Sequence, residues 1–215
     1  MRRKKVLLIV GAGSRVGFAA AKKFINEGFK VLLLSRNQDN LNILKGELLK
    51  YGDDVATYVA DVSDETNLNQ TLDIISKNHK IDVLLYNVAR IVQKDILEEA
   101  SGDLQLDYHA NVIGLQLLVK RLLKNLTETK GTILVTGGGI ALSPKPAYAS
   151  LSMTSAALRS MVNCLENSLK SKNIFIALLM INHRISEDSS LHHPDKIANT
   201  FWGLYNDKSV HEVLM

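Results

Sequence analysis

The sequence is poor in the residues on which disulfide-rich and membrane-embedded proteins depend. Its 215 residues include one cysteine, three prolines and one tryptophan. A single cysteine excludes an internal disulfide and a cysteine-based zinc site, and we predict that Cys164, which falls in a helical pattern, fills a small space in the core. No apolar run approaches the ~20 residues of a membrane span, and Val6–Val10 is too short for a signal-peptide core. We therefore expect a cytoplasmic protein without a membrane segment.

The sequence also lacks linkers, repeats and blocks of like charge. One domain over residues 1–215 is the natural expectation for such a chain. The formal net charge is +4, part of which comes from the basic cluster at residues 2–5. No basic stripe with interleaved aromatic residues is present, so we do not expect a nucleic-acid partner and interpret these charges as solvated surface.

Continuous apolar runs alternate with amphipathic stretches along nearly the whole chain. Such runs are typical of strands that are covered on both faces. The alternation predicts a single Rossmann-like, doubly wound α/β domain, with a mainly parallel seven-stranded sheet, helices on both faces and a ligand crevice at the carboxyl ends of the strands. The predicted strands are Val6–Val10, Val31–Ser35, Val55–Ala60, Ile81–Tyr86, Thr132–Thr136, Ile174–Ile181 and Val210–Leu214.

Capping residues and apolar spacing predict the helices between these strands. Asn37 and Ser63 stand where N-caps are expected. Longer helices are predicted at about 103–126 and 146–171, the second with Pro144 and Pro146 favouring its first turn. A last helix is predicted from Pro194 to about Tyr205.

A glycine-rich turn directly after the first predicted strand is the most informative segment. Gly11 allows a tight turn, Gly13 leaves room for phosphate, and Gly17 lets the following helix pack on its strand. Unpaired N–H groups at the start of that helix would face the pyrophosphate of a dinucleotide. The alternative is a purely structural turn. The residues that we assign to phosphate binding are Gly11, Gly13, Ser14, Arg15, Val16 and Gly17.

Four further segments follow in an order that resembles the short-chain dehydrogenase/reductase family over nearly the full chain. They are Ser35-Arg36, Asp61-Val62, Asn87-Val88-Ala89 and Asn111-Val112-Ile113-Gly114. The resemblance implies a nicotinamide cofactor, with Ser35 and Arg36 at the adenosine ribose. Asp61 and Val62 would lie at the adenine, and Asn87, Val88 and Ala89 would form the floor of the cofactor site.

The residue after the second strand favours NADP over NAD. A carboxylate there would bind the ribose hydroxyls, whereas Arg36 suits a 2′-phosphate. Arg36 has the alternative of being a solvated residue at a helix start, and Asp61 that of a turn former. Arg15 replaces the family's middle glycine, so that it either reaches the 2′-phosphate or crowds the pyrophosphate.

The catalytic segment departs most from the family. By resemblance, Tyr148 is the proton donor, Asn111 supports a proton-relay water, and Thr136 is the hydroxyl nearest to a catalytic serine that is replaced by glycine in residues 137–139. Ser152 stands where the lysine four residues after the tyrosine is expected. Without that ammonium group, a tyrosine of pKa near 10 keeps its proton at neutral pH.

No other cation clearly replaces the lost lysine. Arg159 lies about 16 Å along the helix from Tyr148, and Lys145 would have to fold back from its loop. A divergent branch of the family resembles the chain at Ala149–Ser152 and Ala156–Arg159, but that branch keeps a lysine where this chain has Ser155.

These features lead to one hypothesis and two alternatives. The first hypothesis is an NADP(H)-dependent oxidoreductase that transfers hydride between the nicotinamide and a small carbonyl or alcohol substrate with low efficiency. The second is an NADP(H)-binding redox sensor or scaffold without turnover. The third is a turn closed by Arg15 that binds no dinucleotide.

The remaining expectations concern metals and partners. No closed ligand set accompanies His183, His192 and His193, so we expect solvated loop histidines and no metal site. The family resemblance implies a homo-oligomer formed by the two long helices. A leucine-rich helix face could form its seam, or could simply cover the sheet, and it consists of Leu115, Leu118 and Leu122.

Overall fold

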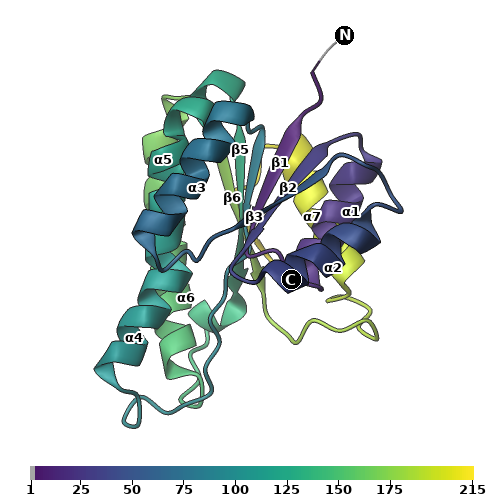
Figure 1. The fold of residues 1–215 in the computed structure, drawn as a ribbon. Helices are drawn as coiled ribbons and strands as arrows, with labels where there is room; N and C mark the ends of the chain where they lie inside the picture. Colours follow the sequence, from purple (N-terminus) through teal and green to yellow (C-terminus); the bar gives the residue numbers. More distant parts are fainter. Residues whose placement is uncertain (1–2) are drawn as a thin grey trace.

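All seven strands found in residues 3–215, the part of the chain that the computed structural model describes, join one parallel sheet (Figure 1). The strand order is β3-β2-β1-β4-β5-β6-β7, so the chain moves outward from β1 in one direction and then returns to continue from β4 in the other. The predicted parallel, doubly wound topology is confirmed. The strands are β1 Val6–Val10, β2 Lys30–Ser35, β3 Val55–Val59, β4 Val83–Tyr86, β5 Thr132–Gly138, β6 Phe175–Ile181 and β7 Glu212–Leu214.

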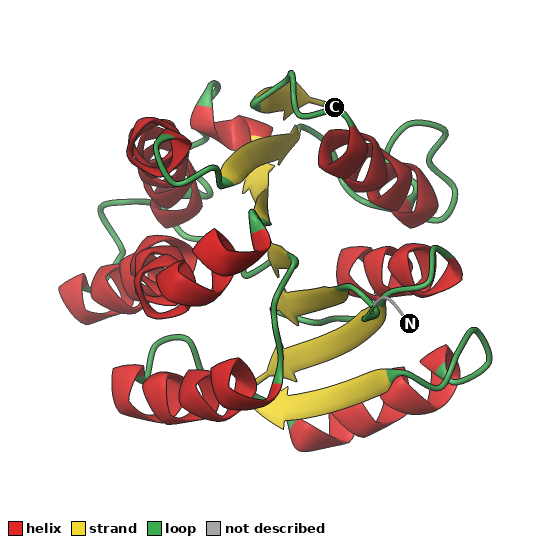
Figure 2. Cartoon of the chain, turned by 90° about the horizontal axis from the view of Figure 1, so that it is seen from above, coloured by secondary structure: helices red, strands yellow, loops and turns green. Residues whose placement is uncertain are grey.

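Helices cover both faces of the sheet, as the view in Figure 2 shows. The helices α1, α2 and α7 pack on one face, and α3, α5 and α6 pack on the other, where α4 leads into α5. No helix of the described residues is long and apolar enough to cross a membrane. The bounds are α1 Val16–Asn26, α2 Gln38–Leu48, α3 Glu65–Asn78, α4 Ser101–Tyr108, α5 Gly114–Thr129, α6 Ala149–Lys170 and α7 Pro194–Asn206.

The strands are apolar throughout because both of their faces are buried. In β1, Leu7 and Ile9 belong to the core under α1, α2 and α7, whereas Val6, Leu8 and Val10 belong to the core under α3, α5 and α6. This alternation follows from the two-residue period of a strand. A polar residue in the middle of β1 would therefore be buried whichever way it pointed.

The predicted helix at 103–126 is interrupted. The chain forms α4, then a π-helical segment over His109–Ile113, and then α5. Wider π turns of this kind are frequent at functional sites. The predicted helix at 146–171 begins later, at Ala149, because residues 145–148 form a turn in which the Tyr148 N–H donates to the Lys145 carbonyl at 2.9 Å.

Capping confirms one prediction and corrects another. The Asn37 side chain accepts from the Asn40 N–H and caps α2, as expected. The cap of α3 is Asp64, whose side chain accepts from the Asn67 N–H at 3.0 Å, so the prediction of Ser63 is wrong. Ser63 instead donates to Asp61, two residues before it.

Cys164 of α6 and the three predicted leucines of α5 differ in burial. Cys164 is exposed, so its assignment to the core is wrong; the buried positions of α6 near it, Leu158, Val162 and Leu169, lie on the other side of the helix. Leu115, Leu118 and Leu122 are fully buried in the core beneath α5. Those three leucines cover the sheet and do not form an outer seam.

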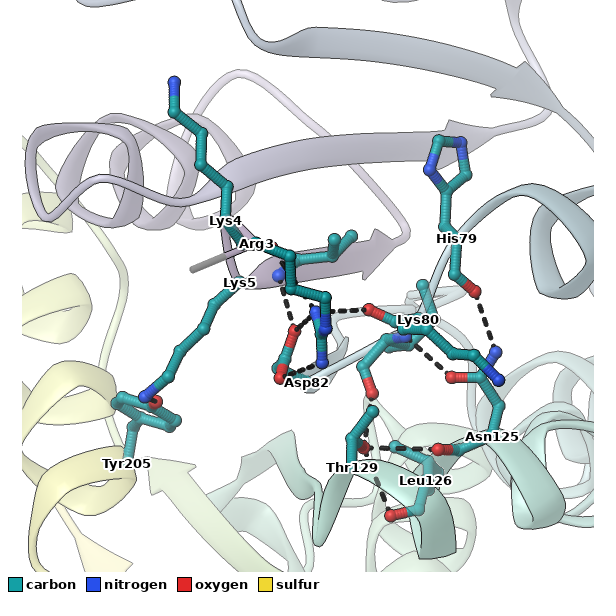
Figure 3. Close-up of polar contacts among 12 residues, drawn as sticks. Arg3, Lys4, Lys5, His79, Lys80, Asp82, Asn125, Leu126, Thr129 and Tyr205 are labelled. Carbon is teal, nitrogen blue, oxygen red and sulfur yellow. Dashed lines mark hydrogen bonds and ion pairs between the residues drawn. The ribbon is translucent and has the colours of Figure 1, made fainter. Parts of the chain in front are cut away.

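Polar contacts close the edge of the sheet where the strands begin (Figure 3). The Asp82 carboxylate accepts two hydrogen bonds from the Arg3 guanidinium at 2.7 and 2.9 Å, and another from the Val6 N–H at 2.8 Å. Nearby, Asn125 of α5 accepts from the Ile81 N–H at 2.6 Å. These groups satisfy backbone and charge at this edge, so the crevice of the sheet lies at the opposite, carboxyl edge.

The basic amino-terminal cluster lies at that closed edge and has partners on it. Lys4 forms an ion pair with Asp54 at 2.5 Å, and the Lys5 ammonium donates to the Tyr205 hydroxyl at 2.6 Å. The side chains of Arg3 and Lys4 remain 49% and 63% exposed, which agrees with the predicted surface location. Arg2 lies outside the described residues.

Candidate functional site

A cleft of about 390 Å³ opens where the sheet order reverses, between β1 and β4 at their carboxyl ends. Ligands of doubly wound sheets bind at this position. The predicted residues that line the cleft are Gly11, Ser35, Arg36, Asp61, Val62, Asn87, Val88 and Ala89. Ala12, Asn37, Asn40, Ser63 and Arg90 also line it and were not predicted as site residues.

The glycine turn has the steric role that its sequence predicts. Gly11 has φ of +80°, and a Cβ there would stand 2.5 Å from the carbonyl oxygen of Asn87. A Cβ on Gly17 would lie 3.2 Å from the Cα of Ala12, because α1 packs closely against the turn. Gly13 differs from both, since a Cβ there would meet no atom within 4 Å. The turn is therefore closed on the protein side and open beside Gly13.

The first turn of α1 presents unpaired N–H groups next to this open space. Within residues 3–215, the amide groups of residues 13–17 donate to no protein acceptor. Arg15 occupies the N-cap position without a side-chain cap bond, and both Ser14 and Arg15 are exposed. Unpaired amides and open space together are what a phosphate group requires.

The ends of β2 and β3 place an arginine beside a carboxylate. Arg36 is exposed and has no ion pair within the described part of the chain. Asp61 accepts from both the N–H and the hydroxyl of Ser63, at 2.9 and 2.6 Å. Burial alone would raise the pKa of Asp61, but the Ser63 hydrogen bonds and the charges of Arg36 and His109 outweigh burial and lower it. Asp61 is therefore a charged group held within its own turn, and Arg36 stays available.

The floor of the cleft is fixed by hydrogen bonds between side chains. Asn87 donates from Nδ2 to the Gly11 carbonyl at 3.0 Å and accepts from the Thr136 hydroxyl at 2.9 Å. The Thr136 hydroxyl proton is thus directed at Asn87. This contact holds the ends of β1, β4 and β5 together.

Arg90, which follows the floor and is itself partly exposed, is the centre of a polar ladder of two rungs. In the first rung its guanidinium contacts Asp107, whose carboxylate is fully buried and also accepts from the Ser150 hydroxyl at 2.5 Å. A second carboxylate, that of Asp103, lies 3.5 Å from the guanidinium. The hydrogen bond that Arg90 donates to Asp107 raises the pKa of Arg90, against the smaller effect of burial. The rung keeps one buried negative charge compensated.

The second rung uses the backbone of Arg90. The Asn111 side chain accepts from the Arg90 N–H at 2.6 Å and donates to the Arg90 carbonyl and to the Thr154 hydroxyl, both at 3.1 Å. Asn111 is 4% exposed and lies in the π-helical segment. Both protons of its amide group are used by protein acceptors, so the side chain itself has none left for a water molecule.

The spacing of these residues contained a signal for the ladder. Asp107 and Asn111 are four apart on one helical segment, and Ser150 and Thr154 are four apart on α6. Two polar residues four apart on each of two neighbouring helices lie on facing sides. Of these four residues, only Asn111 was predicted to belong to the functional site.

Tyr148 lies outside the residues that line the cleft. It is the N-cap of α6, and its hydroxyl donates to Gln93 Oε1 at 3.3 Å. Ser152, four residues later, donates to the Tyr148 carbonyl at 2.8 Å and accepts from the Lys145 N–H at 3.1 Å. Lys145 is exposed and contacts Ser152 through its backbone, and Arg159 pairs with Glu212 at 2.7 Å.

The part of α6 that faces the end of β5 is one turn further along. A Cβ on Gly138 would lie 3.4 Å from the Ser155 hydroxyl, and Ser155 is 7% exposed. The residue four before Ser155 is Leu151. The resemblance implies a tyrosine and, four residues later, a lysine. If the lysine position is the residue that faces Gly138, the two positions are Leu151 and Ser155.

The histidines of the segment after β6 do not form a metal site. Within residues 3–215 no group of three or more potential ligands comes together. His192 is only 5% exposed and packs edge-on against the His183 ring, so the expectation of a solvated side chain is wrong for His192. His193 caps α7 and pairs with Glu187 at 2.8 Å.

Comparison with known proteins agrees with this geometry. The chain is 27% identical over 175 residues to an uncharacterized oxidoreductase, YvrD, of Bacillus subtilis, with 81% of this chain and 66% of that protein covered. It is 25% identical over 177 residues to inactive hydroxysteroid dehydrogenase-like protein 1 of Pongo abelii, with 80% of this chain and 54% of that protein covered. The chain thus spans between half and two thirds of the length of these relatives.

Solved structures share the fold over almost the entire chain. An alcohol dehydrogenase from the archaeon Thermococcus sibiricus, complexed with 5-hydroxy-NADP, superposes with a TM-score of 0.88 at 21% identity, with 99% of this chain and 96% of that chain covered. A family model described as short chain dehydrogenase matches residues 5–182. Because this match includes β1 to β6 and the whole cleft, the chain belongs to the short chain dehydrogenase family.

Proposed function

We propose that the protein binds NADP(H) in the cleft between β1 and β4 and acts mainly through that binding, with little or no turnover of a carbonyl or alcohol. One observation carries the proposal. Opposite Gly138, α6 presents Ser155, with Leu151 one helical turn before it, whereas Tyr148 is bonded to Gln93 outside the cleft. This arrangement favours the hypothesis of a nucleotide-binding protein without turnover over the reductase hypothesis.

The cleft fits the phosphates of a dinucleotide. The unpaired amides of residues 13–17 and the space beside Gly13 would hold the pyrophosphate. Arg36, at the end of β2, would bind a 2′-phosphate and so favour NADP over NAD. The complex of the Thermococcus sibiricus enzyme with an NADP derivative supports this preference.

Acid–base chemistry is the part that these residues do not supply. When bound, the nicotinamide ring provides or accepts hydride, but reduction of a carbonyl also needs a proton at the new alkoxide. Leu151 carries no proton to donate. Ser155 is a weak acid, and the cation four residues along its helix, Arg159, is paired with Glu212. The Thr136 hydroxyl is directed at Asn87. That a relative in the family is named inactive is consistent with this proposal.

Two measurements on one preparation test the proposal. Thermal unfolding with saturating NADPH should shift to higher temperature, since a ligand at 100 times its Kd adds about 2.7 kcal/mol of stability. Consumption of NADPH with a panel of aldehydes, ketones and quinones should stay at the background rate. Consumption that disappears in Tyr148→Phe would instead establish the reductase hypothesis with Tyr148 as the proton donor.

We also propose that the protein forms a homo-oligomer through α4 and α6. An apolar groove of about 510 Å³ lies between them, and Met153 and Tyr108 on its walls are 54% and 44% exposed. Light scattering should give at least a dimer mass, and Met153→Lys should shift it to the monomer mass. A monomer mass for the unmodified chain would contradict the proposal.

A further inference from the structure

The polar groups that remain available in the cleft are unevenly distributed. Arg15, Arg36 and the amides of residues 13–17 have no protein partner within residues 3–215, whereas Thr136, Asn111 and Arg90, toward β5 and α6, are bonded to other parts of the protein. Unpaired donors are free to bind a ligand, so their position indicates which part of a nucleotide the protein recognises. An assignment of the recognised half of the nucleotide rests on the proposed function, because it concerns the same cleft.

The adenosine side of the cleft offers unpaired donors. Arg36 and Arg15 make no ion pair or side-chain hydrogen bond within residues 3–215, and the amides of residues 13–17 donate to no protein acceptor. Asn40 also lines the cleft here with its side chain exposed. All of these groups attract phosphate or bind ribose, and both arginines carry full positive charge.

The opposite side has its polar groups already paired. The hydroxyl of Thr136 is bonded to Asn87, the Asn111 amide is bonded to Arg90 and Thr154, and the Arg90 guanidinium is bonded to Asp107. The Thr136 and Asn111 protons would have to leave a protein acceptor in order to donate to a nicotinamide ribose or carboxamide.

Asn182 and two residues of α6 also distinguish the side of the cleft toward β5. A Cβ on Gly139 would stand only 2.5 Å from Asn182 Oδ1, so the Asn182 side chain lies directly against this buried glycine. Leu151 and Ser155 stand where the family resemblance implies a tyrosine and a lysine. The 390 Å³ cleft is lined by Gly11 and Ala12 of the glycine turn and by Ser35 and Arg36, with residues 13–17 beyond its lining at the start of α1, and it is lined by none of residues 136–155.

We infer that this cleft recognises the 2′-phosphoadenosine diphosphate half of the nucleotide, and that the nicotinamide half adds little affinity. The ligand class is an adenosine 5′-diphosphate that carries a further phosphate on its ribose. The redox state of the nicotinamide ring would then have little effect on binding, so the protein would respond to the total NADP(H) concentration.

Calorimetric titration of the full chain with four ligands tests the inference. NADP and 2′,5′-ADP should bind with Kd values within about tenfold of each other, 5′-ADP should bind at least about tenfold more weakly, and nicotinamide mononucleotide should give no binding. NADPH and NADP should have the same Kd within about threefold.

Variants assign the phosphate contact. Arg36→Ala should abolish the difference between 2′,5′-ADP and 5′-ADP, and because Arg36 is exposed the variant should fold normally. Lys172→Ala, which removes an exposed positive charge just after α6 at the other edge of the sheet, is the matched control and should leave all affinities unchanged.

The possible failures are distinguishable. If NADP binds more than about tenfold tighter than 2′,5′-ADP, this inference is overturned while the proposed function stands. If Arg36→Ala weakens both adenosine ligands equally, the assignment of the 2′-phosphate to Arg36 is overturned. If none of the ligands binds, the inference and the proposed function fail together.

Discussion

The Arg90 guanidinium contacts the Asp107 carboxylate, which is fully buried between α4 and α6. This pair connects the floor of the cleft to two helices, since Arg90 directly follows Asn87–Ala89 and Asp107 also accepts from Ser150. Buried charges of this kind are costly when one partner is lost, because the other cannot regain its hydration.

Removing the arginine should therefore destabilise the fold strongly. Arg90→Ala leaves the Asp107 charge buried, and we expect a loss of about 3–5 kcal/mol in the free energy of unfolding measured with urea. Arg121→Ala is the matched control: Arg121 also pairs with an aspartate, Asp73, but both side chains are about half exposed, and its loss should cost less than about 1 kcal/mol. Equal losses in the two variants would contradict the role assigned to the Arg90 pair.

Two glycines of the same turn should respond differently to alanine. Gly11→Ala places a Cβ 2.5 Å from the Asn87 carbonyl oxygen at a φ of +80°, so it should destabilise the protein by at least ~1–3 kcal/mol. Gly13→Ala meets no protein atom and should leave stability within about 0.5 kcal/mol of the unmodified chain.

The same Gly13→Ala variant should lose nucleotide affinity, because its methyl group extends into the space that the phosphates would occupy. We expect NADP to bind at least about tenfold more weakly by calorimetry. An unchanged Kd in a normally folded Gly13→Ala protein would place the phosphates elsewhere.

Asp61 should give stability a specific dependence on pH. Its pKa in the folded protein lies below the usual range, so Asp61 stabilises the fold above the unfolded-state pKa of about 3.9, and this contribution is lost as the pH falls through the lower, folded value. Asp61→Asn should therefore be less stable than the unmodified chain at pH 6, with the difference shrinking below about pH 4. Urea unfolding at several pH values measures it, and a difference that does not change with pH would contradict the shifted pKa.

The absent acid–base groups can be restored. Gly138→Ser, Leu151→Tyr and Ser155→Lys together would place a hydroxyl, a phenol and an ammonium group on the facing positions of β5 and α6. We expect the triple variant to oxidise NADPH with a carbonyl substrate at least about hundredfold faster than the unmodified chain. Circular dichroism and NADP binding control for folding, because Ser155 is buried. A folded, nucleotide-binding triple variant without activity would contradict the alignment of Leu151 with the family's tyrosine.

The sequence predicted the sheet well because both faces of its strands are buried. Runs such as Val6–Val10 and Val31–Ser35 have no other common explanation than a covered parallel sheet, and the glycine turn fixed the position of the cleft. The strand ends were less certain, since β5 continues through Gly137 and Gly138, which have no side chain to signal a strand.

The candidate site was predicted only in part, because some of its residues lie in short motifs and others meet only through contacts between distant segments. The residues of the glycine turn, Arg36 and the floor each lie within a short sequence motif, and those motifs predicted them. The Arg90 ladder joins three distant segments. The pairs of polar residues four apart indicate polar helix faces, but the sequence does not show that α4 and α6 lie side by side. Tyr148 matched the expected residue type, but its non-helical N-cap backbone directs it toward Gln93.

The central claim is that NADP binds at the glycine turn while α6 contributes no reacting group. A titration of isotope-labelled protein with NADP, followed by amide NMR shifts, tests it most directly. The largest shifts should occur at residues 11–17, Arg36 and Asn87–Ala89, with much smaller ones at Leu151 and Ser155. No shifts at saturating nucleotide, or shifts centred on residues 151–155 rather than on the turn, would contradict it.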